Sequence, residues 1–115
     1  MPVDRRPIDQ MIEDVGPEAF QRLVRLFAEE TRDAAAELQR QLAARNWREL
    51  GRQAHSLKHA TSSFGLTELA ARAAALEKAA DAQLGVEAGV QLAALEQETA
   101  ADLAALNQLL SAIEV

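Results

Sequence analysis

The fold of this chain is decided around Ala54-His55-Ser56-Leu57-Lys58-His59-Ala60-Thr61-Ser62-Ser63-Phe64-Gly65. Apolar positions recur here at intervals of three and four residues, which is the spacing of one face of an α-helix. These positions are Leu50, Ala54, Leu57, Thr61 and Phe64. The other side carries Arg48, Arg52, His55, Lys58, His59 and Ser62. The stretch therefore predicts an amphipathic helix that packs on one side, ends at Gly65 and holds two imidazoles in solvent.

The composition favours one all-helical domain. The 115 residues are 49% hydrophobic but only 3% aromatic, and most of the apolar content is alanine and leucine, which suit helix interiors. A chain of this length can bury a core without cross-links. Cysteine is absent, which excludes disulfides and thiolate metal sites. We expect residues 1–115 to form a single domain.

Charge and hydropathy argue against two classes of partner. The formal net charge of −6 does not suit a protein that binds the phosphate backbone of nucleic acids. The chain has no basic segment followed by an apolar run at its start, and no uninterrupted apolar stretch of about 18 residues, so neither a signal peptide nor a membrane span is predicted. We expect a cytoplasmic monomer, and the initial methionine and the full set of helices favour a free-standing protein.

The periodic pattern predicts further helices on both sides of the central one. A short helix is expected from Ile8 to Val15, with Ile8, Met11, Ile12 and Val15 on one face, after an irregular start marked by Pro2 and Pro7. Longer helices are expected over Pro17 to about Arg45, Asn46 to Gly65, Leu66 to Gln83, and from a turn bracketed by Gly85 and Gly89 to about Ile113. Short connections between long helices favour antiparallel neighbours. The predicted fold is an all-α, up-down-up-down four-helix bundle with a short additional N-terminal helix.

Two local signals lie near the start of the central helix. Asn46 followed three residues later by Glu49 is typical of an N-terminal cap. Gly51, inside the helix, costs roughly 1 kcal/mol relative to alanine. We place Gly51 on the polar side, one turn before His55, where it either keeps that side low or is simply tolerated.

The two histidines are the groups in this chain with reactivity near neutral pH. The sequence has no P-loop, no Gly-rich dinucleotide turn, no Gly-x-Ser-x-Gly elbow and no cysteine nucleophile. A neutral imidazole nitrogen is a competent nucleophile toward phosphorus. The four-residue spacing of His55 and His59 can also bind zinc, but no obvious third ligand accompanies the pair. We therefore predict no metal site.

The run Ala54-His55-x-Leu57-Lys58, with Gly65 ten residues after the histidine and Leu76-Glu77 further on, resembles the histidine-containing phosphotransfer (HPt) domain family. The resemblance extends over nearly the whole chain, because the flanking helices have the lengths that this family uses. It implies that His55 accepts a phosphoryl group from an aspartyl phosphate on a response-regulator receiver domain and passes it to another receiver. The implied partners are receiver domains and a hybrid sensor histidine kinase. The protein would be a phosphocarrier rather than a kinase, and the receiver would supply the Mg²⁺ that phosphoryl transfer needs.

The resemblance also implies roles for neighbouring side chains. Lys58 would place positive charge beside the phosphoryl oxygens, and Glu77 would accept a hydrogen bond from the ring nitrogen of His55 that does not react. His59 departs from the family, which usually has glycine directly after the motif lysine. Its ring either contacts the phosphoryl group or the receiver, or points aside. Further candidates for contact with a receiver are Arg48, Arg52 and Ser62.

Other functions remain open at this point. A bundle that has lost phosphotransfer would bind and sequester a receiver domain or a kinase, and the bulk of His59 is the feature that allows this. A scaffold bundle without a receiver partner is a further alternative. In those cases His55 is an ordinary surface histidine, and Glu77 is an ordinary carboxylate paired with Arg72 or Lys78.

Overall fold

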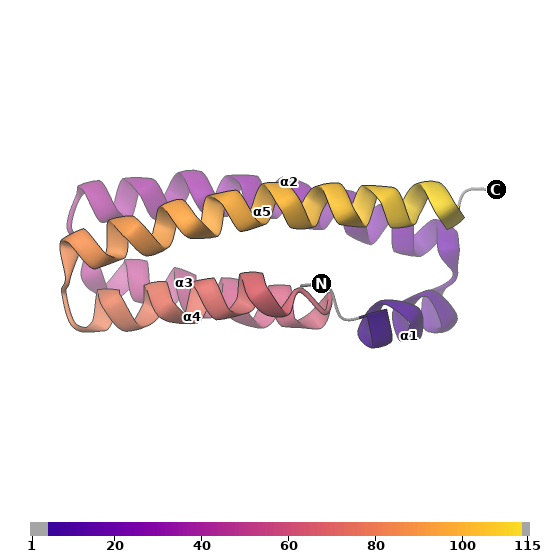
Figure 1. The fold of residues 1–115 in the computed structure, drawn as a ribbon, viewed down its shortest axis with the longest axis horizontal. Coiled ribbons are helices and arrows are strands. Elements are labelled where there is room, and N and C mark those ends of the chain that lie inside the picture. The colour runs from indigo at the N-terminus through magenta and orange to yellow at the C-terminus, as the bar shows by residue number, and fades with distance from the viewer. Residues whose placement is uncertain (1–4, 114–115) are drawn as a thin grey trace.

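The computed structural model describes residues 5–113, which form five helices. They are α1 (Arg5–Val15), α2 (Pro17–Ala43), α3 (Trp47–Ser63), α4 (Thr67–Asp81) and α5 (Gly85–Ile113). From α2 to α5, each helix runs antiparallel to the one before it (Figure 1). They close into a ring, because α2 and α4 each pack against both α3 and α5. The predicted all-α, up-down-up-down four-helix bundle with a short additional N-terminal helix is confirmed.

Unequal helix lengths determine the shape of the molecule. Helices α2 and α5 contain 27 and 29 residues, whereas α3 and α4 contain 17 and 15. The longer pair therefore extends beyond the α3–α4 hairpin, and α1 lies beneath this extension (Figure 1). Helix α1 packs against α2 and buries Ile8 completely. None of the helices formed by residues 5–113 is both long and apolar enough to span a membrane.

The apolar face of α3 is buried as the sequence pattern predicts. Leu50, Ala54 and Thr61 are fully buried, and Leu57 is nearly so. The Thr61 hydroxyl donates to the carbonyl of Leu57 at 2.8 Å, so its burial leaves no unpaired polar group. Phe64 is partly buried against the same core. One face of α3 is thus fixed in the core, and its opposite face is free to carry chemistry.

Both ends of α3 have the caps that position it against its neighbours. The Asn46 side chain accepts a hydrogen bond from the backbone amide of Glu49 at 3.4 Å, as predicted. At the other end Gly65 has φ 68°, and the Leu66 amide donates to the Thr61 carbonyl at 3.1 Å. This is the hydrogen-bond pattern of a Schellman motif, in which glycine suits the left-handed position. Because Leu66 is fully buried, the chain turns back at once and α4 returns alongside α3.

The expected start of the chain was wrong in two respects. Helix α1 begins at Arg5 and includes Pro7, because a proline in the first helical turn sacrifices no intrahelical hydrogen bond. Val15, expected on the buried face, is half exposed. Pro2 lies outside the described residues.

The expected turn between Gly85 and Gly89 was also wrong, since both glycines lie inside α5. The turn is instead made by Gln83, which adopts the left-handed conformation with φ 57°. The amide of Leu84 donates to the Ala79 carbonyl at 2.9 Å and closes this turn. Helix α5 then begins immediately, so the connection between α4 and α5 is shorter than the sequence indicated.

Gly51 was placed on the polar side of α3, and the structure corrects this. Gly51 is buried where α3 meets α4. A Cβ atom at this position would lie 3.0 Å from the Asp81 side-chain oxygen and 3.7 Å from the Cβ of Ala80. The missing side chain therefore allows α4 to approach α3 closely, one turn before His55.

Candidate functional site

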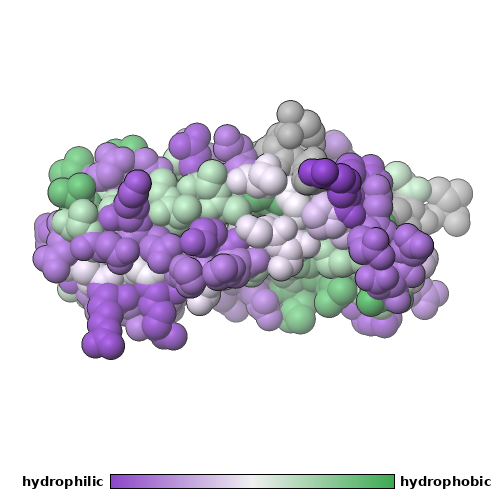
Figure 2. Space-filling view, turned by 90° about the horizontal axis from the view of Figure 1, so that it is seen from below, coloured by the Kyte–Doolittle hydropathy of each residue, from purple (hydrophilic) through white to green (hydrophobic). Residues whose placement is uncertain are grey.

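The His55 side chain is exposed in the middle of α3. Its side chain is 48% exposed, whereas its neighbour Ala54 is fully buried in the core. The α3–α4 hairpin, which is the lower layer in Figure 1, presents a mainly hydrophilic face when the molecule is seen from below (Figure 2). The imidazole is thus accessible to a large partner, and the packed helix beneath it holds its backbone in place.

Glu77 on α4 fixes the orientation of the His55 ring. Its Oε2 atom lies 2.9 Å from Nδ1 of His55. An ionised carboxylate can only accept a hydrogen bond, so Nδ1 is the donor. In the neutral imidazole the lone pair is then on Nε2. The contact between α3 and α4 therefore selects the tautomer in which Nε2 is the nucleophilic nitrogen.

Lys58 lies one turn along α3 from His55 and shares the same carboxylate. Its Nζ atom is 3.5 Å from Oε1 of Glu77. Glu77 thus holds an imidazole on one oxygen and an ammonium group on the other. A shallow hollow of about 450 Å³ beside this cluster is lined by Lys58, Ala74, Ala75, Glu77, Lys78 and Asp81. The hollow thus carries the ammonium groups of Lys58 and Lys78 beside the carboxylates of Glu77 and Asp81.

His59 contacts the other nitrogen of His55. The two Nε2 atoms are 3.0 Å apart, and the rings meet edge to face with centroids 4.5 Å apart. The His59 ring therefore lies against the candidate nucleophile and does not point aside. With the lone pair of His55 on Nε2, His59 must supply the N–H of this hydrogen bond.

The remaining predicted contact residues lie on α3 but have other interactions. Arg52 forms an ion pair with Glu49, and its hydrogen bond lowers the pKa of the Glu49 carboxyl. The Ser62 hydroxyl donates to the carbonyl of Lys58 at 2.9 Å, and Arg48 is exposed. The geometry brings His55 together with Lys58, His59 and Glu77, whereas Arg52 and Ser62 bond to neighbours on α3 itself.

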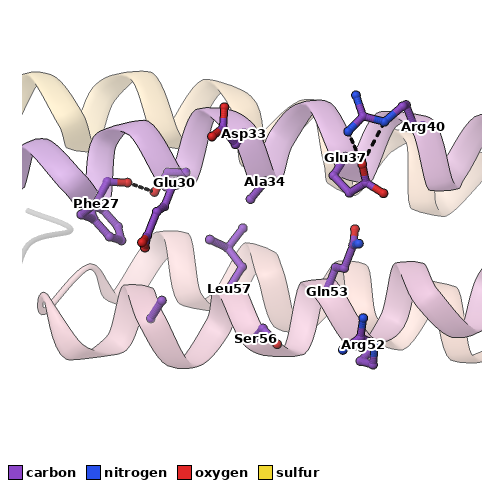
Figure 3. Close-up of a pocket in the computed structure, with 12 residues that line it drawn as sticks. Phe27, Glu30, Asp33, Ala34, Glu37, Arg40, Arg52, Gln53, Ser56 and Leu57 are labelled. Atoms are coloured by element: carbon purple, nitrogen blue, oxygen red, sulfur yellow. Dashed lines mark hydrogen bonds and ion pairs between the residues drawn. The ribbon is translucent and has the colours of Figure 1, made fainter.

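A groove between α2 and α3 was not anticipated from the sequence. It has a volume of about 540 Å³, and Figure 3 shows Phe27, Leu57 and the ion pair of Arg40 with Glu37 at its walls. Gln53 also lines it and has a buried side-chain oxygen without a hydrogen-bond partner. The groove depends on the pairing of two separate helices, so no local pattern could have predicted it.

Asp102 on α5 is a buried carboxyl group that sequence reasoning missed. The residue is 1% exposed, and the carboxyl group of Glu98 on the same helix interacts with it. Burial raises the pKa of Asp102 to about 7, and the nearby carboxyl groups of Glu98 and Glu68 act in the same direction. The sequence pattern could have indicated this burial, because Asp102 follows Thr99 by three residues and so lies on the same buried side of α5.

The side chains around His55 were also compared with the requirements of a metal site. Among residues 5–113 no group of three or more histidine, cysteine, aspartate or glutamate side chains is arranged to bind a metal. The cluster consists of the exposed imidazole of His55, the carboxylate of Glu77 that orients it, the ammonium group of Lys58 and the second imidazole of His59.

Comparison with known families identifies the class of protein to which this bundle belongs. The sequence model of the Hpt domain family matches residues 22–114, so the chain belongs to the Hpt domain family. The matched range includes all of α3, α4 and α5. Searches of the curated proteins and of the solved structures gave no match. The family membership supports a role in histidine phosphotransfer within two-component signalling.

Proposed function

We propose that this protein relays a phosphoryl group between the aspartates of receiver domains, using His55 as the acceptor, in a cytoplasmic two-component phosphorelay. The observation that carries the proposal is the hydrogen bond of 2.9 Å between Nδ1 of His55 and Glu77. It leaves a lone pair on Nε2, which is the requirement for attack on phosphorus. A hybrid sensor histidine kinase would supply the first receiver.

The chemistry needs no proton transfer. The Nε2 lone pair of His55 attacks the phosphorus of an aspartyl phosphate, so an N–P bond forms while the P–O bond to the aspartate breaks. The aspartate carboxylate leaves with the bonding electrons. Glu77 stabilises the positive charge that develops on the ring, and Lys58 attracts the phosphoryl oxygens. Transfer to a second receiver reverses these steps, and the receiver domains would hold the Mg²⁺ that phosphoryl transfer uses.

A relay experiment tests this proposal. The protein is incubated with a ³²P-phosphorylated receiver domain, and a second receiver is then added. We expect an acid-labile, base-stable label to appear on the protein and then to move to the second receiver. Receiver domains from several signalling systems should be used, because the proposal defines the partner only as a receiver domain that carries a phosphorylated aspartate.

One observation favours a second function, in which the bundle sequesters a receiver or a kinase without transfer. His59 covers Nε2 of His55 at 3.0 Å, and a permanent cover would prevent attack. The same relay experiment separates the two functions when receiver binding is measured by calorimetry. Tight binding with no exchange of label, unaffected by His55→Ala, would establish sequestration and refute the relay.

Removing the carboxylate of Glu77 should slow phosphotransfer strongly. In Glu77→Leu the Nδ1 atom of His55 loses its acceptor, so the ring is free to rotate and to change tautomer. Loss of a carboxylate that orients a metal-binding histidine typically costs about 10- to 100-fold, and we expect a loss of the same order here. Glu77→Gln keeps an oxygen that can accept the hydrogen bond, so it should lose clearly less. The measurement is the initial rate of labelling by a phosphorylated receiver.

The matched control for this prediction is Glu96→Leu, which removes a carboxylate that lies on α5 and bonds to Gln39. This variant should label at the wild-type rate. If Glu77→Leu and Glu96→Leu behave alike, Glu77 has no orienting role.

A further inference from the structure

The nitrogen of His55 that must react is covered in this structure. Its lone pair on Nε2 accepts a hydrogen bond from Nε2 of His59 at 3.0 Å. The cover depends on the His59 side chain, and a glycine at this position would lack it. Two cases follow. Either His59 blocks attack by Nε2 of His55, or the His59 N–H turns to another hydrogen-bond acceptor when the reaction begins.

The assignment of donor and acceptor follows from the contacts on both sides of the His55 ring. Glu77 accepts a hydrogen bond from Nδ1–H, so the one proton of the neutral ring is on Nδ1 and Nε2 of His55 has none. The hydrogen bond can then form only if His59 carries its proton on Nε2. The structure thus presents an N–H group directed at the point where the new N–P bond would form.

The arrival of a phosphoryl group gives this N–H a better acceptor. When Nε2 of His55 bonds to phosphorus, its lone pair is used, and the His59 N–H loses its partner. The closest new acceptors are the phosphoryl oxygens, which are attached to the atom bonded to that nitrogen. Hydrogen bonds to charged acceptors are roughly twice as strong as those between neutral groups. His59 is exposed, so its ring can shift without disturbing the core.

We propose that His59 is a phosphoryl-binding residue. Its Nε2–H covers the acceptor nitrogen in the unphosphorylated protein and then donates to a phosphoryl oxygen of phosphorylated His55, which lengthens the lifetime of the phosphohistidine. Lys58, whose Nζ atom lies 3.5 Å from Oε1 of Glu77, would be a second donor to the phosphoryl group. This inference rests on the proposed function only in that His55 is the acceptor.

The test uses phosphoramidate as a small phosphoryl donor, so that no receiver is required. Wild-type protein, His59→Ala and His59→Gln are phosphorylated, freed of donor, and followed as the phosphohistidine decays, with a chelator present throughout. Losing one charge-assisted hydrogen bond should make the decay in His59→Ala several-fold to about tenfold faster. His59→Gln offers an amide N–H and should recover most of the wild-type lifetime. Ser63→Ala removes a hydroxyl that bonds to the backbone carbonyl of His59 at 3.2 Å and leaves the His59 ring unchanged, so it controls for a general perturbation of the helix and should decay as wild type.

A second readout reports the hydrogen bond itself. In ¹⁵N-histidine-labelled protein, Nε2 of His59 should carry a proton before phosphorylation, and its resonance should shift when His55 is phosphorylated. Ser63→Ala should show the same shift. A proton on Nδ1 of His59, or a resonance that does not move, would overturn the proposed contact.

The outcomes distinguish this inference from the proposed function. If His55 is labelled and decays at the same rate in wild type and His59→Ala, the role of His59 is refuted and the relay proposal is unaffected. If His59→Gln decays as fast as His59→Ala, donation of an N–H is refuted. If neither phosphoramidate nor a phosphorylated receiver domain labels His55, both proposals fail.

Discussion

His55→Ala should reduce labelling by a phosphorylated receiver domain to the background level, while His59→Ala remains labelled. The difference follows from the orientation of the two rings. Only His55 has its Nδ1 atom held by a carboxylate and its Nε2 lone pair selected for attack. The measurement is the acid-labile, base-stable label on each variant after incubation with the same receiver.

Both variants should fold, so that a lost label reports chemistry. The His55 side chain is half exposed on a helix, and alanine is the best helix former. Circular dichroism and the thermal midpoint should match those of the wild type. Full labelling of His55→Ala, or loss of label only in His59→Ala, would show that the acceptor has been assigned to the wrong ring.

Asp102→Asn should make the protein markedly more stable above pH 7. Burial raises the pKa of Asp102 to about 7, compared with about 3.9 for an unperturbed aspartate. Between these values the folded chain keeps a proton that the unfolded chain releases, so the free energy of unfolding falls as the pH rises from about 4 to about 7. Each unit of pKa shift corresponds to about 1.4 kcal/mol, so the buried charge costs a few kcal/mol at higher pH.

The measurement is the thermal midpoint of wild type and Asp102→Asn between pH 4 and pH 8. The gain of the variant should be small at the acid end, grow with pH and level off above pH 7. One kcal/mol corresponds to roughly 4 °C or more in a domain of this size, so the gain should reach several degrees. The control Asp33→Asn removes an exposed carboxylate of α2 and should keep the pH dependence of the wild type. An equal gain at every pH would contradict a buried ionisable group.

The bundle and the bounds of α3 could be predicted because their signals are local. The apolar stripe of α3 and the cap at Asn46 are each contained in a few consecutive residues, and Gly65 marks the end of the helix. The predicted turn between Gly85 and Gly89 was wrong because glycines usually mark turns. Here the turn needs a left-handed residue at Gln83, a conformation that non-glycine residues adopt at an energetic cost.

The geometry of the site depends on contacts between helices, which local patterns do not contain. His55 and Glu77 are 22 residues apart, and their contact requires the correct register of α4 against α3. That register is set by the Schellman turn at Gly65 and by the close approach at Gly51, which the sequence reading had placed on the wrong side. The resemblance to the family implied the contact of Glu77, whereas it left the orientation of the His59 ring open.

The most direct test of the account is to identify the nitrogen that carries the phosphoryl group. Protein labelled with ¹⁵N-histidine is phosphorylated by a receiver domain and examined by ³¹P and ¹⁵N NMR. The account predicts phosphorus bonded to Nε2 of His55, with Nδ1 still protonated and bonded to Glu77. Phosphorus on Nδ1 of His55 or on either nitrogen of His59 would contradict it.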